Sequence, residues 1–153
     1  VDTPQNLYNA PGNLFVAGFI GSPQMNMLDA VVDVKGQDVY LKVGDAASIK
    51  LPAEKAKKLT GYNGKTVVMG IRPEHLSDDE EAIAKSDAIV EAKIEVYELL
   101  GAEVYLYFTV NGSNMTARVN PRTQARTGDT VKFALDVDKI HVFDKETEIT
   151  ITN

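Results

Sequence analysis

Short segments with an apolar side chain at every second position run through most of this 153-residue chain. Residues 90–96, 104–110 and 130–137 each alternate between apolar and other side chains, so each segment presents one apolar face. Successive side chains of a strand point to opposite faces of a sheet, and a period of two therefore predicts half-buried β-strands. Strands with polar outer faces are typical of antiparallel sheets, and the chain has no long helical repeat that would indicate a parallel α/β sheet.

Turn sequences separate these segments at short intervals. Lys35-Gly36-Gln37-Asp38 lies between two alternating runs, and Asn111-Gly112 is a strong signal for a tight hairpin turn. The spacing predicts about eight or nine short strands in a small barrel, with one short helix at residues 53–59. The two halves are also loosely alike, because each has a hairpin followed by a strand that approaches an apolar-rich turn.

The first 21 residues differ from the remainder. Thr3-Pro4 suits the first turn of a helix, and the apolar run at residues 14–21 predicts a second helix, buried between layers. That run is far shorter than the roughly 20 residues that cross a bilayer. The chain starts without methionine or a signal sequence, and we expect it to be part of a longer chain.

Residues 77–87 are the most polar part of the chain, and we expect a solvated, mobile loop there. Ser77 and Glu80 have the spacing of a helix capping box, which is the alternative. The domain boundaries that follow are a helical segment at residues 1–21 and a β domain at residues 22–153.

The charge and the composition exclude several classes of function. The net charge is −6, and an acidic protein repels phosphate backbones, so we expect no nucleic-acid partner. The chain has no cysteine, which excludes disulfides, thiolate nucleophiles and cysteine metal sites.

Residues 70–75, Gly-Ile-Arg-Pro-Glu-His, follow an apolar run and place a Glu–His pair after a predicted strand. The only other histidine is His141, and a carboxylate with two histidines can bind a metal, but a lone histidine more often satisfies local hydrogen bonds. Pro73 cannot donate to a strand ladder and holds Arg72 extended. We therefore expect a structured corner where a strand leaves the barrel, with Arg72 and Glu74 on the same side.

Other candidate motifs lack the neighbouring residues or elements that their function requires. Gly64-Lys65-Thr66 resembles the end of a phosphate-binding loop, but the first glycine of that motif would fall at Leu59 and no helix follows. No Gly-x-Ser-x-Gly elbow occurs, so a nucleophilic triad has no support. Tyr97, Tyr105 and Tyr107 could form a stacking platform for sugars or bases, but we favour packing or a protein interface.

Four segments together resemble the C-terminal region of MalK-type ATPase subunits of carbohydrate-importing ABC transporters, closest to the MsmK/UgpC-like branch. They are residues 7–28, "LYNAPGNLFVAGFIGSPQMNML"; 70–76, "GIRPEHL"; 101–108, "GAEVYLYF"; and 139–147, "KIHVFDKET". The resemblance covers nearly the whole chain. It implies a mostly β fold, an antiparallel OB-like tandem barrel of the TOBE/MOP-like type, with a short helical segment at its N-terminal end.

The resemblance also implies a function. The family's ATP and Mg sites belong to an ATPase domain whose motifs are absent here, so no catalytic, cofactor-binding or metal-binding residue is carried over. The chain is expected to be a regulatory and dimerisation domain, with a second copy, permease subunits and a phosphotransferase-type regulator as partners. The parent protein would lie in the cytoplasm, on the inner face of the membrane. A small-ligand sensor for a sugar or oxyanion is the alternative, and a free-standing nucleic-acid binder ranks third.

The residues assigned to the family-motif corner, as a candidate interface, are Arg72, Pro73, Glu74, His75, His141, Phe143 and Asp144.

Overall fold

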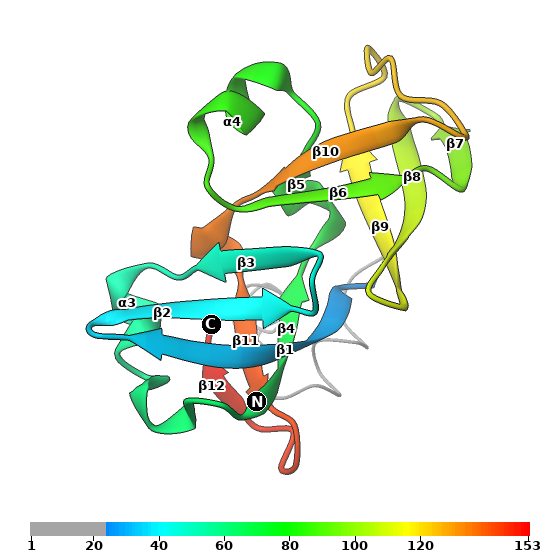
Figure 1. Ribbon diagram of the computed structural model, residues 1–153. Helices are drawn as coiled ribbons and strands as arrows, with labels where there is room; N and C mark the ends of the chain where they lie inside the picture. The colour runs from blue at the N-terminus through cyan, green and yellow to red at the C-terminus, as the bar shows by residue number, and fades with distance from the viewer. Residues whose placement is uncertain (1–23) are drawn as a thin grey trace.

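A computed structural model describes residues 24–153, and this part of the chain consists mainly of strands (Figure 1). The strands are β1 Asn26–Lys35, β2 Asp38–Val43, β3 Ala47–Lys50, β4 Thr66–Ile71, β5 Leu76–Ser77, β6 Ile89–Lys93, β7 Val96–Leu100, β8 Glu103–Val110, β9 Ser113–Val119, β10 Thr130–Leu135, β11 His141–Asp144 and β12 Thr150–Thr152. The helices are α3 Ala53–Ala56 and α4 Glu80–Lys85, with 3-10 turns η1 Thr60–Tyr62, η2 Pro73–His75 and η3 Val137–Lys139. The helices expected in residues 1–21 lie outside the described residues.

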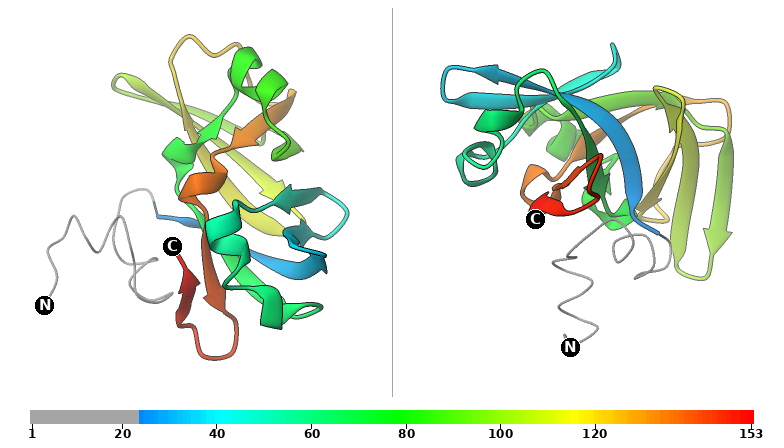
Figure 2. Two further views of the ribbon diagram at one scale, coloured as in Figure 1. Left: turned by 90° about the vertical axis from the view of Figure 1, so that its left-hand side faces the viewer. Right: turned by 90° about the horizontal axis from the view of Figure 1, so that it is seen from below.

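The described strands form three sheets, and every pair is antiparallel. One sheet has the strand order β12-β11-β4-β1-β2-β3, a second β5-β10-β6 and a third β7-β8-β9. The second and third sheets lie together above the first in Figure 1, and Figure 2 shows the β7-β8-β9 sheet at the side of the molecule. The expected mostly β, antiparallel OB-like architecture is confirmed.

Three tight hairpins follow from the backbone freedom of their turn residues. Gly36 and Gly101 each have a positive φ at the first position of a two-residue turn, which is the type II′ pattern. Asn111 and Gly112 both have a positive φ, as a type I′ turn requires. These turns match the right-handed twist of the paired strands, so they fix the register of the hairpins.

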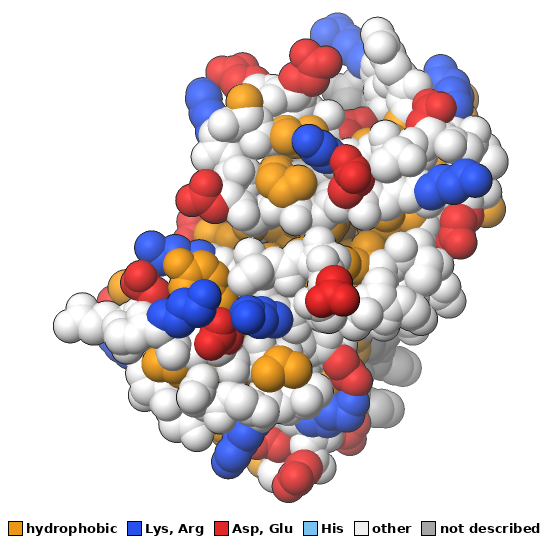
Figure 3. Space-filling model, in the orientation of Figure 1, with side chains coloured by type: hydrophobic (Ala, Val, Ile, Leu, Met, Phe, Trp, Pro, Cys, Tyr) orange, Lys and Arg blue, Asp and Glu red, His pale blue; other side chains and the backbone are white. Residues whose placement is uncertain are grey.

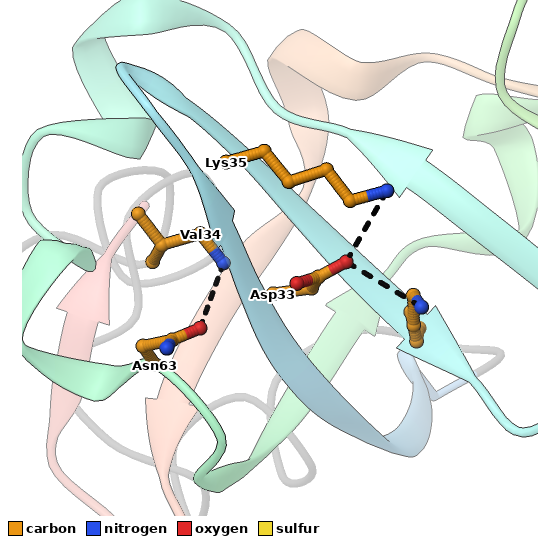
Figure 4. Close-up of polar contacts among 5 residues, drawn as sticks. Asp33, Val34, Lys35 and Asn63 are labelled. Atoms are coloured by element: carbon orange, nitrogen blue, oxygen red, sulfur yellow. Dashed lines mark hydrogen bonds and ion pairs between the residues drawn. The ribbon is translucent and has the colours of Figure 1, made fainter.

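Side chains outside the ladder hold the β1–β2 hairpin, as Figure 4 shows. The Val34 N–H donates to Asn63 Oδ1 at 2.9 Å, which joins β1 to the segment before β4. The Asp33 carboxylate lies 3.6 Å from Lys35 Nζ and 3.4 Å from Lys42 Nζ. Asn63 therefore takes the place of a ladder partner where β1 runs past the end of β4.

The strand after each of the corners η2 and η3 pairs with the other half of the chain. β5 follows η2 and pairs with β10, whereas β11 follows η3 and pairs with β4. The Asp136 N–H also donates to the His75 carbonyl at 3.0 Å, which ties the two corners together. The loose duplication in the sequence is therefore an exchange of strands between two half-domains.

The two half-domains share one hydrophobic core. A single cluster of buried apolar side chains includes residues from all three sheets, and the stacked rings of Phe108 and Phe133, 4.7 Å apart, lie within it. A smaller cluster of Met25, Val68 and Phe143 packs separately. Because most of the core is continuous, we expect the halves to unfold together.

The structure differs from the sequence-based expectation at two places. The loop expected at residues 77–87 contains helix α4, because the Asp79 side chain accepts a hydrogen bond from the Ala82 N–H and caps it. Val96, expected inside, is 50% exposed because the chain leaves β6 after Lys93 and enters a different sheet at β7. Within residues 24–153, none of the helices has the length and apolar character needed to span a membrane.

Candidate functional site: the corner between the half-domains

The structure brings the two predicted motifs, residues 70–75 and 139–144, side by side. β4 pairs with β11, so that His141 lies opposite Gly70 and Phe143 lies opposite Val68. All seven predicted site residues lie either on the corner after β4, at residues 72–75, or on β11. Glu74 lies within the same 3-10 turn as Pro73 and His75. The motifs that the sequence places in different halves therefore form one site.

The corner after β4 is built from the chain's own backbone. Arg72 is extended, with φ −72° and ψ 149°, and Pro73 begins η2 because its fixed φ suits the first position of a turn. The His75 N–H donates to the Arg72 carbonyl at 3.0 Å. Residues 73–75 are thus a 3-10 turn and not the extended chain on which the shared side of Arg72 and Glu74 was predicted.

Burial separates the site residues into two groups. Arg72 is 1% exposed and His141 is 5% exposed, and Pro73 and Phe143 are also buried. Glu74, His75 and Asp144 are half-buried. The first group packs in the interior of the domain, so an interface at this corner would have to use the half-buried residues of the second group.

His141 is held neutral by its surroundings. Its Nδ1 lies 2.9 Å from Asn153 Oδ1, an atom that only accepts, so Nδ1 carries the proton. Burial lowers the pKa of His141 to about 4, and the positive charges of Lys55 and Arg72 act in the same direction. Burial also lowers the pKa of His75. At neutral pH the His141 imidazole is therefore an uncharged hydrogen-bond donor.

Lys55 from α3 joins the same network. It is 6% exposed, and its ammonium donates to the carbonyl oxygen of Asn153. Burial lowers the pKa of Lys55, while Asp138 and Asp136 oppose that shift. Asn153 thus links the α3 lysine to the histidine of β11.

Asp144 forms the turn that follows β11. Its Oδ1 accepts hydrogen bonds from the Glu146 and Thr147 N–H groups, both at 2.9 Å, and Tyr62 donates to its Oδ2 at 3.3 Å. The Thr147 backbone bond is the main cause that lowers the pKa of the Asp144 carboxyl. These bonds give the side chain a structural role at this corner.

Gly70 lies at a closely packed position of β4. A Cβ at this position would lie 2.5 Å from Met25 Sδ and 3.1 Å from a ring carbon of Phe143. We predict that Gly70→Val destabilises the protein by about 1–3 kcal/mol, the usual cost of overpacking, in urea unfolding. Gly61→Val is the control, because nothing lies within 4 Å of a Cβ there. Equal losses in the two variants would contradict the packing argument.

A groove of about 1080 Å³ opens between α3 and the segment that joins α4 to β6. Figure 3 shows hydrophobic side chains exposed in the indentation between the two halves. Apolar residues line its inner part, among them Leu51, Pro52, Ala56, Ala88 and Leu135. None of the described residues that line it is aromatic, so residues 24–153 offer no ring there for stacking on a sugar.

The described side chains at the corner make structural hydrogen bonds. Among residues 24–153, no group of three or more His, Asp or Glu side chains could hold a metal ion. Together with the exchanged strands, the buried corner defines an OB-type β domain built from two interlocked halves.

Comparison with known families agrees with this class. The model of the MalK OB fold domain matches residues 21–76, and that of the TOBE domain matches residues 69–143. The two matches overlap at residues 69–76, which is the corner described above. The chain belongs to the MalK-type family and carries its OB fold and TOBE domains.

Two curated relatives are named as ATP-binding proteins of import or transport. The chain is 40% identical, over 99% of its length, to the oligosaccharides import ATP-binding protein MsmX of Bacillus subtilis. It is also 40% identical to the multiple sugar-binding transport ATP-binding protein MsmK of Streptococcus mutans. It spans 41% and 40% of the lengths of these two proteins.

A solved structure of the cytoplasmic molybdate-binding protein ModG has the same fold. The TM-score is 0.57 at 13% sequence identity, with 80% of this chain and 96% of that chain covered. At this identity the likeness concerns the fold alone.

Sequence reasoning missed three features of the molecule. The groove has no sequence signal, because distant segments form it. Asn26, which is buried at 5% exposure and bonds to β9, lies in the family-like segment at residues 7–28 but was assigned no role. The exposure of Val96 follows from the break between β6 and β7. The alternation at residues 90–96 continues across this break, so no sequence pattern indicates it.

Proposed function

We propose that this chain is the non-catalytic regulatory and dimerisation domain of the ATP-binding subunit of a carbohydrate ABC importer. The observation that carries the proposal is the 40% identity to MsmX over 99% of this chain. The parent protein would couple ATP hydrolysis to sugar uptake while bound to permease subunits at the inner face of the cell membrane. ATP and Mg would bind in its ATPase domain.

The proposed partners are a second copy of the subunit, the permease subunits and a phosphotransferase-type regulator. A lasting contact between two such domains would keep two ATPase halves at a high effective concentration while they open and close. A regulator would act by preferring one state of that dimer. A nucleic-acid partner is not proposed, because the chain carries a net charge of −6.

A chimera tests the proposal. The part of Bacillus subtilis MsmX that aligns with this chain is replaced by this chain, and the chimera is expressed in cells that lack MsmX. We expect oligosaccharide uptake to be restored, because 40% identity over the whole aligned part preserves the fold and its contacts. A folded, expressed chimera without uptake, beside active MsmX, would count against the proposal.

We predict that ATP with Mg does not raise the melting temperature of this chain and that the chain does not hydrolyse ATP. A ligand that binds only the folded state raises its stability, so binding would appear as a shift. The Gly64–Thr66 segment leads into β4 and not into a helix, so it has no helix N-terminus to direct N–H groups at phosphate. Differential scanning fluorimetry measures the shift, and a clear rise would contradict the non-catalytic assignment.

Small-ligand sensing is the second candidate, and the groove favours it. Its volume of about 1080 Å³ is slightly above that of usual ligand sites, about 300–1,000 Å³. Titration calorimetry with sugars and with molybdate would separate the two functions. Ala88 lines the groove, and a tryptophan there would fill part of it. Saturable binding that Ala88→Trp abolishes would therefore favour a small-ligand sensor.

A further inference from the structure

Strand β7, Val96–Leu100, concentrates the exposed apolar side chains of the described residues. Val96, Leu99 and Leu100 are 50%, 57% and 52% exposed. Only two other large hydrophobic residues in the described range are comparably exposed, Val31 at 41% and Ile149 at 60%, and they lie on other elements.

β7 is also an open edge. Among the strands of residues 24–153 it pairs with β8 alone and ends its sheet. Natural proteins protect such edges with lysine, proline, bulges or a covering element, because an exposed apolar edge is a template for pairing. β7 contains no lysine or proline, its one charged side chain, Glu98, accepts a hydrogen bond from Tyr107, and its register with β8 is continuous. An edge of this kind is suited to a pairing partner.

The hairpin geometry fixes which backbone groups are available. Leu100 and Glu103 close the two-residue turn between β7 and β8, so they form a hydrogen-bonded pair. Such pairs alternate along an antiparallel ladder, so Glu98 and Val96 also direct their N–H and C=O groups toward β8. The N–H and C=O groups of Tyr97 and Leu99 therefore point to the open edge.

We propose that β7 pairs antiparallel with β7 of a second copy of this chain, about a twofold axis at Leu99. In this register Leu99 lies opposite Leu99 of the second copy, and their backbone groups form a hydrogen-bonded pair. Glu98 lies opposite Leu100 of the second copy. The inference rests on the proposed self-association and names the surface that forms it.

Charge and neighbouring contacts select this register. An axis at Glu98 would place two carboxylates directly opposite each other, which is destabilising. An axis at Tyr97 would need the Glu95 N–H for a pair with Leu99 of the second copy, but that N–H already donates to the Tyr107 carbonyl at 2.8 Å. The Arg126 guanidinium also lies over the Tyr97 ring, 4.7 Å from its centroid. The axis at Leu99 avoids both conflicts.

On the outer face of the β7-β8-β9 sheet, two tyrosines of β8 lie beside β7 and would extend the contact with the second copy. Tyr107 lies opposite Val96 in the ladder, and its hydroxyl donates to Glu98 Oε1 at 2.8 Å. Tyr105 donates to Glu103 at 3.1 Å, and both tyrosines are half-buried. A five-residue edge is smaller than a standard interface of about 1,600 Å², so the isolated domains should associate weakly.

Cysteine crosslinking tests the register, because the chain has no cysteine of its own. Cα atoms of a hydrogen-bonded antiparallel pair lie about 5.5 Å apart, within the range that a disulfide spans. Leu99→Cys should therefore form a disulfide-linked dimer on mild oxidation. Tyr97→Cys should not, because its mate would lie more than about 10 Å away. Ile149→Cys is the exposed control and should stay monomeric.

Sedimentation equilibrium, up to about 1 mM protein, separates this surface from self-association in general. We expect a dimer for the wild type and for Ile149→Lys, and a monomer for Leu99→Lys with an unchanged melting temperature. A dimer that survives Leu99→Lys, without selective crosslinking of Leu99→Cys, would overturn the β7 surface and leave the proposed dimerisation standing. A strictly monomeric wild type without selective crosslinking would overturn both.

Discussion

Replacing Asn26 with alanine is expected to destabilise the protein by about 2–5 kcal/mol, since two part-buried backbone groups lose their partners. Asn26 is 5% exposed, and its side chain bonds twice to one residue of another sheet. Its Nδ2 donates to the Thr116 carbonyl at 2.8 Å, and its Oδ1 accepts from the Thr116 N–H at 2.7 Å. The amide thus imitates a strand neighbour for β9 and joins β1 to the third sheet.

Asn63→Ala is the matched control for Asn26→Ala. Asn63 also bonds a backbone N–H with its side-chain oxygen, but it makes one such bond at an exposed position. We expect that control to lose about 0.5–1.5 kcal/mol, the usual net value of one hydrogen bond. Urea unfolding of the three proteins measures the difference. Similar losses for the two variants would show that the link between β1 and β9 is not a main source of stability.

The sequence predicts the strands of this fold better than it predicts their partners. The alternation at residues 104–110 places Val104, Leu106, Phe108 and Val110 inside, and all four are buried. The turn at Asn111-Gly112 was also predicted from a local pattern, and the positive φ of both residues confirms it. The exchange of β5 and β11 between the halves cannot be predicted from a local pattern, because it depends on which strands pair after the chain has collapsed.

The same distinction applies to the corner. Pro73 and the extended Arg72 follow from rules about single residues, and they are confirmed. Arg72 is 1% exposed in a corner built from elements that are distant in the sequence, because β11 pairs with β4 before it and β9 packs against η2 after it, and no local pattern encodes this. Helix α4 was missed for a related reason, since a single cap at Asp79 outweighs a polar composition that is typical of loops.

The stability of the protein is expected to fall between pH 6.5 and pH 4 by up to about 3 kcal/mol through His141 alone. The direction follows from the pKa of His141, which burial lowers to about 4 in the folded protein from an unfolded value of 6.5. Above pH 6.5 both states are neutral at this residue. As the pH falls through this window, the unfolded chain binds a proton that the folded protein does not, so the unfolded state is favoured. Burial also lowers the pKa of His75, which adds to the loss in the same direction.

His141→Gln separates this effect from the carboxylates, which also titrate near pH 4. Glutamine has a side-chain amide that can still bond to Asn153, but it does not titrate. The variant should be less stable than the wild type at pH 7, because the imidazole fills its site better. Urea unfolding at pH 7 and at pH 4.5 should then show that the gap shrinks by about 2–3 kcal/mol at the lower pH, because only the wild type loses the contribution of the neutral imidazole. Parallel stability curves for the two proteins would mean that His141 binds protons equally well in both states, and the corner would then be more open to water than its 5% exposure indicates.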